Sequence, residues 1–127
     1  MNDIFIKCIG NFDKTMKTTL SAFLIIDGKF YAAQVGDSRI YLFRDNTAFQ
    51  ITSNHSYVAE LAEKGLMTFD EAKVAEKKNF LTRCIGNMSD FSPDFYSGEV
   101  FSGDCFSISS DGFHGGLIAS EMNSIIA

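Results

Sequence analysis

Residues 34–43 read QVGDSRIYLF, a stretch that breaks two apolar, β-rich runs with a glycine, a carboxylate, a hydroxyl and a guanidinium. Gly36 and Asp37 both tolerate unusual backbone angles, so the simplest interpretation is a turn between strands. The alternative is that Asp37 stands at a strand end in order to bind a ligand. Both interpretations predict a strand on each side of the break.

A β-hairpin precedes this stretch. Residues 19–26 (TLSAFLII) and 29–35 (KFYAAQV) flank Asp27 and Gly28, a dipeptide typical of tight primed turns. The first run is apolar at odd and even positions alike, a pattern typical of strands buried on both faces. We therefore expect a sheet that is covered on both sides.

A second hairpin follows. Residues 40–43 and 48–51 flank Asp45 and Asn46, which again favour a tight turn. The helices that connect parallel strands are missing from this part of the sequence. The first 52 residues therefore predict an antiparallel meander.

The rest of the chain mixes helices and strands. Residues 57–64 predict a helix that ends at Gly65, and residues 68–77 predict another, with Thr68 and Glu71 at capping-box spacing. The remaining expected elements are a short helix over 1–11, strands over 95–101 and 105–109 joined by a turn at 102–104, and a helix from about 120. The predicted fold class is α+β.

Composition narrows the function classes. The chain has 127 residues, 46% of them hydrophobic, which suits a single domain with a real core. A formal charge of -5 makes nucleic acid an unexpected partner, and no apolar run is long enough to span a membrane. Three widely spaced cysteines, Cys8, Cys84 and Cys105, suggest reduced core thiols in a cytoplasmic protein.

Few side chains are candidates for chemistry. Asp111 follows the alternating run CFSISS and precedes Gly112, which repeats the setting of Asp37. Two carboxylates at strand ends can converge on Mg²⁺ or Mn²⁺, although an aspartate beside glycine is more often a turn residue or cap. His55 and His114 stand in loops without a second ligand at metal-binding spacing, so a catalytic role for either is the less favoured interpretation.

The order of five short motifs is more specific. MKTT (16–19), VGDSRIYLF (35–43) and TSNHS (52–56) resemble the MGTT, VGDSR-x-YL and T-x-DHS motifs of the metal-dependent PP2C (PPM) serine/threonine phosphatases, particularly the bacterial type. LTRCIG (81–86) and SISSDGF (107–113) are similar to that family's LTRALG and LLCSDGL. The resemblance covers most of the chain from residue 16 onward.

This resemblance implies a fold, a reaction and metal ligands. The fold is an α-β-β-α sandwich of two antiparallel sheets flanked by helices. The reaction is phosphoester hydrolysis by a water held between two Mn²⁺ or Mg²⁺ ions, acting on phosphoserine and phosphothreonine proteins. By motif position, Asp111 matches a core metal ligand and Asp37 a carboxylate associated with a third, weaker metal.

The chain also departs from the family pattern. It lacks the family's N-terminal metal-binding strands, its DGMGG-like motif and its closing Asp-Asn segment with the last strand, so residues 1–127 are expected to form one partial domain. Lys17 replaces the glycine of MGTT, and Asn54 replaces the aspartate of DHS. We expect weak metal binding and weak or absent activity for the isolated chain, with a non-catalytic pseudophosphatase as the alternative. Uncovered edges and apolar faces predict a homodimer or a complex with the missing segment.

Overall fold

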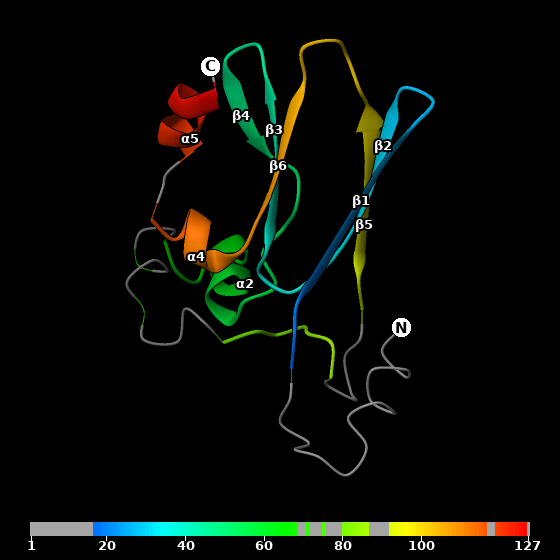
Figure 1. Cartoon of the computed structure of the whole chain (residues 1–127). Coiled ribbons are helices and arrows are strands. Elements are labelled where there is room, and N and C mark those ends of the chain that lie inside the picture. The colour runs from blue at the N-terminus through cyan, green and yellow to red at the C-terminus, as the bar shows by residue number, and fades with distance from the viewer. Residues whose placement is uncertain are drawn as a thin grey trace.

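A computed structural model describes most of the chain (Figure 1). The described residues are 17–68, 71, 75, 80–86, 92–116 and 119–126. The expected helix over 1–11 and most of the one over 68–77 lie outside them. At the start of the latter, the Thr68 N–H donates to Glu71 Oε2 at 2.8 Å and the Glu71 N–H donates to Thr68 Oγ1 at 3.2 Å. These two bonds are the predicted capping box.

Both predicted hairpins are confirmed. Strands β1 (Leu20–Ile26) and β2 (Lys29–Val35) pair antiparallel, as do β3 (Arg39–Arg44) and β4 (Thr47–Gln50). Each hairpin turns on two residues with positive φ: Asp27 and Gly28 at 51° and 71°, and Asp45 and Asn46 at 50° and 55°. Positive φ at both central positions is what a primed turn requires, and these residue types tolerate it.

The next two strands join different sheets. Strand β5 (Asp94–Glu99) pairs with β2, whereas β6 (Cys105–Ser109) pairs with β3. The result is a first sheet of order β1-β2-β5 and a second sheet of order β4-β3-β6. The expected turn at 102–104 therefore crosses from one sheet to the other.

Arg44 fixes this crossing. Its guanidinium donates to both carboxylate oxygens of Asp104 at 2.7 Å and to the Glu99 carbonyl at 3.0 Å, and it lies 4.5 Å from the centre of the Phe101 ring. The hydrogen bond from Arg44 lowers the pKa of Asp104 to about 2. The end of β3 is thereby tied to the chain that leaves β5.

The core lies between the two sheets. The rings of Phe23 and Phe30 from the first sheet meet Phe106 from the second at centroid distances of 4.8 and 5.5 Å. Ile40 on β3 is fully buried, and Leu42 is buried two residues further along. These two side chains lie on the same face of β3 because the side-chain period of a strand is two.

Three helices complete the described fold. Helix α2 (Tyr57–Glu63) begins at Ser56, and helix α4 (Asp111–His114) follows β6 directly. Helix α5 (Ala119–Ile126) covers the outer face of the second sheet, where Met122 packs against Tyr41 and Phe43. Figure 1 shows α5 on the far side of this sheet from β1 and β2. Among the described residues, no helix is long and apolar enough to cross a bilayer.

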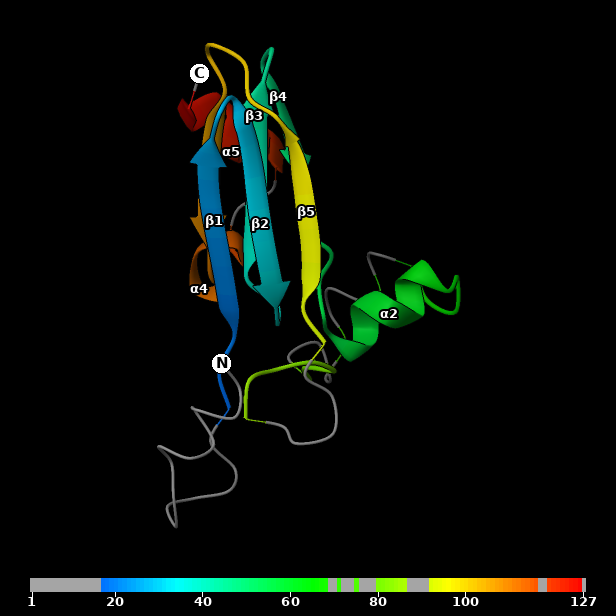
Figure 2. The same ribbon diagram turned by 90° about the vertical axis from the view of Figure 1, so that its right-hand side faces the viewer.

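The first sheet is open on its outer face, so the prediction that it is covered on both sides was wrong. The large apolar side chains exposed on this outer face are Leu24 (56% exposed), Ile26 (50%), Tyr31 (46%) and Phe95 (76%). Figure 2 views this face with α4 and α5 behind it. Apolar residues on both sides of β1 therefore do not mean that both sides are buried by this chain.

The cysteines differ in burial. Cys84 is a buried free thiol, as expected, but Cys105 is exposed, so the prediction of a core thiol at that position was wrong. Cys105 and Phe106 are neighbours on β6 and so point to opposite faces of the sheet; Phe106 points into the sandwich and Cys105 points away from it. Cys8 lies outside the described residues.

Candidate functional site

The motifs found in the sequence meet at one end of the sandwich. Thr18 and Ile85 exchange backbone hydrogen bonds of 3.0 and 2.8 Å, which joins the first motif to the fourth. The Thr82 N–H donates to the His55 carbonyl at 2.9 Å, and the His55 N–H donates to the Gly36 carbonyl at 3.1 Å. Segments far apart in the sequence are thus held side by side.

Asp37 and Asp111 lie at this same end. Strands β3 and β6 run antiparallel, and their last paired residues are Arg39 and Ser109. Asp37 stands two residues before Arg39, and Asp111 stands two residues after Ser109. The register therefore gives the two aspartates corresponding positions just beyond the paired strands. Asp37 is half-buried and Asp111 is exposed.

Asp111 begins helix α4. Its Oδ1 accepts the N–H of Gly112 at 2.8 Å, and its carbonyl accepts the N–H of Gly115 at 2.8 Å. Among the described residues, neither Asp111 nor Asp37 forms a salt bridge. Both carboxylates are therefore available to a cation.

The loop that holds Asp37 is tightly constrained. Gly36 has φ +110°, and a Cβ at this position would lie 2.3 Å from Cγ2 of Thr19. The buried Gln34 amide donates to the Gly36 carbonyl at 3.3 Å and also to the Ser38 carbonyl. The hydroxyls of Thr19 and Ser38 are 3.1 Å apart. Neighbouring groups therefore hold the backbone on both sides of Asp37.

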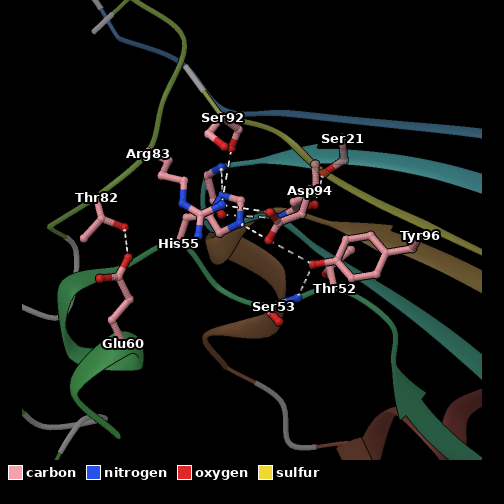
Figure 3. A network of polar contacts seen from close by, with 12 residues as sticks. Ser21, Thr52, Ser53, His55, Glu60, Thr82, Arg83, Ser92, Asp94 and Tyr96 are labelled. Carbon is pink, nitrogen blue, oxygen red and sulfur yellow. Dashed lines mark hydrogen bonds and ion pairs between the residues drawn. The ribbon is translucent and has the colours of Figure 1, made fainter. Parts of the chain in front are cut away.

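A polar network stands behind this loop (Figure 3). The His55 side chain is 2% exposed; its Nδ1 accepts the Gly36 N–H at 3.1 Å and its Nε2 lies 2.9 Å from Asp94 Oδ2. Arg83 Nη1 donates to Asp94 Oδ1 at 2.8 Å, and the Tyr96 hydroxyl lies 3.4 Å from Oδ2. Burial would raise the pKa of Asp94, but the bonds from His55 and Arg83 outweigh it and lower that pKa.

Sequence reasoning did not single out Asp94. Asp94 belongs to none of the five motifs. It lies on β5 opposite Gln34 and two positions before Tyr96, so its side chain is on the inner face of the first sheet. An acid at a core-facing position of an alternating strand was the signal that could have identified it. His55, which the sequence left open as a ligand, is instead occupied at both ring nitrogens. The side chain of His114 lies outside the described part of the structure.

Asn54 is a third residue with an oxygen that could bind a cation. It immediately precedes His55, whose N–H donates to the carbonyl of Gly36, the residue before Asp37. Asn54 Oδ1 is buried and has no hydrogen-bond partner among the described residues. Amide oxygens are ligands for hard cations, although they carry no charge.

The candidate ligands among the described residues are two carboxylates and one amide oxygen. Mg²⁺ and Mn²⁺ prefer oxygen ligands, and Mg²⁺ usually takes one or two carboxylates and keeps several waters, whereas a two-metal site needs bridging and terminal carboxylates. Within the described ranges, no three His, Cys, Asp or Glu side chains are grouped so that they could hold a metal. The described residues therefore do not fit a two-metal centre.

Comparison with known proteins agrees with the motifs. Residues 13–65 match the model of the protein phosphatase 2C family. The protein phosphatase PhpP of Streptococcus pneumoniae is 40% identical over 111 residues, which cover 87% of this chain and 45% of that protein.

Solved structures share the fold. A Streptococcus agalactiae serine/threonine phosphatase is 31% identical with a TM-score of 0.93, and the match covers 99% of this chain and 52% of that one. The catalytic domain of the phosphatase PstP in complex with two manganese ions is 24% identical, with a TM-score of 0.78 over 98% of this chain and 56% of that one. The chain therefore spans about half the length of the proteins it matches. On its motifs, fold and relatives, it belongs to the protein phosphatase 2C (PPM) family.

Proposed function

We propose that this chain carries the function of its family, the Mn²⁺- or Mg²⁺-dependent hydrolysis of phosphoserine and phosphothreonine in proteins. Asp111 and Asp37 are the residues that would hold a metal ion. The observation that carries the proposal is the β3–β6 register, which leaves both carboxylates at the end where the motifs meet. The names of the relatives and the manganese in the PstP structure support this reaction class and cofactor.

We also propose that residues 1–127 form one partial phosphatase domain in the cytoplasm, with little activity alone. With Mn²⁺ and a phosphothreonine peptide, the purified chain is expected to release little more phosphate than its Asp111→Ala variant, because two carboxylates hold a metal weakly. Phosphate release measures this. Robust Mn²⁺-dependent turnover that Asp111→Ala abolishes would contradict the expectation of a weak isolated chain.

The alternative is a pseudophosphatase that keeps the fold as a binding or regulatory module. It is favoured by the neutral side chain of Asn54, whose Oδ1 has no hydrogen-bond partner within the described part of the chain, and by Lys17 at a glycine position. A chimera separates the two functions: this chain replaces the matching segment of PhpP, which supplies the other half. Mn²⁺-dependent hydrolysis that is lost on Asp111→Asn supports the phosphatase. A folded but inactive chimera supports the pseudophosphatase.

A second copy of the chain is the partner we propose for the outer face of the first sheet. Lys29 and Glu99 are register partners on this face, so a two-fold axis can set each against its opposite charge in the other copy. From the usual spacing between strands and the usual rise per residue, the outer face of this three-stranded sheet has an area of roughly 330 Å². Because a standard interface buries about 800 Å² per partner, the dimer is expected to be weak.

Sedimentation velocity over a concentration series tests this dimer. The mass is expected to rise from monomer toward dimer, and Leu24→Lys is expected to hold the chain monomeric by placing a charge on the apolar face. Leu66→Lys is the matched control, because Leu66 is 72% exposed and lies on none of the strands. A monomer at every concentration, or equal effects of the two variants, would contradict the proposal.

A further inference from the structure

We propose that His55 is a positioning residue whose imidazole ring sets the backbone at Gly36 and thereby the direction of the Asp37 carboxylate. The inference deepens the proposed function and rests on it for the role of Asp37. Its basis is a double link: the Gly36 N–H donates to His55 Nδ1 and the His55 N–H donates to the Gly36 carbonyl, both at 3.1 Å. Since Gly36 immediately precedes Asp37, both links act one residue from the carboxylate.

The ring is held in one orientation. Because Nδ1 accepts a hydrogen bond, the ring proton lies on Nε2, which donates to Asp94 Oδ2 at 2.9 Å. Asp94 is fixed in turn by Arg83 at 2.8 Å. Figure 3 shows these side chains converging from separate segments. A chain of bonds thus runs from Arg83 through Asp94 and His55 to Gly36.

Two halves of the ring have separable roles. The Nε2 side bonds to the Asp94 carboxylate and ties strand β5 to the loop that carries His55, which is a contribution to stability. The Nδ1 side bonds to the backbone beside Asp37, which is a contribution to the site. Burial of the ring at 2% exposure leaves little room for water to replace either bond. Substitutions that keep one side and lose the other can therefore tell positioning from stability.

His55→Asn and His55→Gln are the matched variants. Asparagine can place Oδ1 where Nδ1 stands and so keeps the acceptor for Gly36, whereas glutamine can place its amide nitrogen near Nε2 and so keeps the donor to Asp94. Mn²⁺ affinity is measured by electron paramagnetic resonance, with thermal unfolding recorded alongside. His55→Gln is expected to weaken Mn²⁺ binding about tenfold, as loss of a supporting partner behind a metal ligand does, and His55→Asn is expected to stay close to the unsubstituted chain. Equal losses that track the melting temperature would overturn the proposal.

A metal-free measurement keeps this inference separate from the proposed function. Long-range ¹H–¹⁵N spectra of the unsubstituted chain are expected to show the Nε2–H tautomer of His55. Amide exchange at Gly36 is expected to rise at least tenfold in His55→Gln but not in His55→Asn. An Nδ1–H tautomer, or unchanged exchange in both variants, would overturn the positioning role even if Mn²⁺ binds. Absence of Asp111-dependent Mn²⁺ binding, with these two results as expected, would overturn the proposed function instead.

Discussion

Gly36→Ala is expected to destabilise the fold by about 2–5 kcal/mol, combining left-handed backbone strain with overpacking. Gly36 has φ +110°, and the added Cβ would lie 2.3 Å from Thr19 Cγ2, 2.5 Å from its Cβ and 3.2 Å from its Cα. The third contact is with backbone, so a change of side-chain rotamer cannot relieve it. Urea unfolding monitored by circular dichroism measures the loss.

Gly103→Ala is the control for this prediction. Gly103 has φ +93°, but a Cβ there would meet nothing within 4 Å. Its cost is therefore expected to be the backbone strain alone, roughly 1–2 kcal/mol. Equal losses for the two variants would mean that Thr19 does not press on Gly36. The loop around Asp37 would then be less constrained than the structure indicates.

The turns were the most predictable part of the fold. Asp27 with Gly28, and Asp45 with Asn46, are residue types that accept positive φ, and the structure has positive φ at all four. This chemistry is local, so two neighbouring residues carry enough information to predict a hairpin. The partners of later strands are not local. Residues 102–104 are consistent with a hairpin turn, but they connect β5 and β6 across two sheets.

Burial was less predictable than pairing. The residues of β1 are apolar on both sides, which favoured a sheet covered twice, yet Leu24 and Ile26 are exposed. The sequence of a strand shows which of its faces are apolar, but it does not show whether the same chain or another one covers them. The exposed face is therefore a property of this chain alone, and the proposed dimer is one way to cover it.

The common position of the two candidate ligands at one end of the sandwich was predictable, but the side chains that support them were not. Asp37 and Asp111 stood out because each follows a strand and precedes a turn or helix, and the β3–β6 register leaves them at one end. The support consists of the contact of His55 with Asp94 and the two hydrogen bonds between His55 and Gly36. These contacts join segments about 20 to 40 residues apart in the sequence. No spacing rule in a single sequence encodes such contacts.

Asp111→Asn is expected to weaken Mn²⁺ binding at least tenfold. The loss of a residue that only supports a metal ligand already costs about 10–100-fold in affinity, and Asp111 is proposed to bind the ion directly. Asparagine keeps the size of the side chain and an oxygen that can accept the Gly112 N–H, so the start of α4 is expected to survive. The effect would then come from the lost charge. Titration calorimetry or electron paramagnetic resonance gives the affinity.

Asp45→Asn is the matched control for charge. It removes the same negative charge from the turn between β3 and β4, at the other end of β3 from Asp37. Asparagine also tolerates the φ of 50° at this position. Mn²⁺ affinity is expected to change little. Equal weakening by both variants would mean that Mn²⁺ responds to net charge and not to a site.

The location of bound Mn²⁺ tests the central claim, that this chain contributes one shared end with two metal-binding carboxylates. Paramagnetic broadening is recorded for the ¹⁵N-labelled chain as Mn²⁺ is added. The account predicts that amides of residues 36–38 and 110–112 broaden first and together, and that Asp111→Asn weakens both effects. Broadening centred elsewhere, or at one of these two segments without the other, would contradict it.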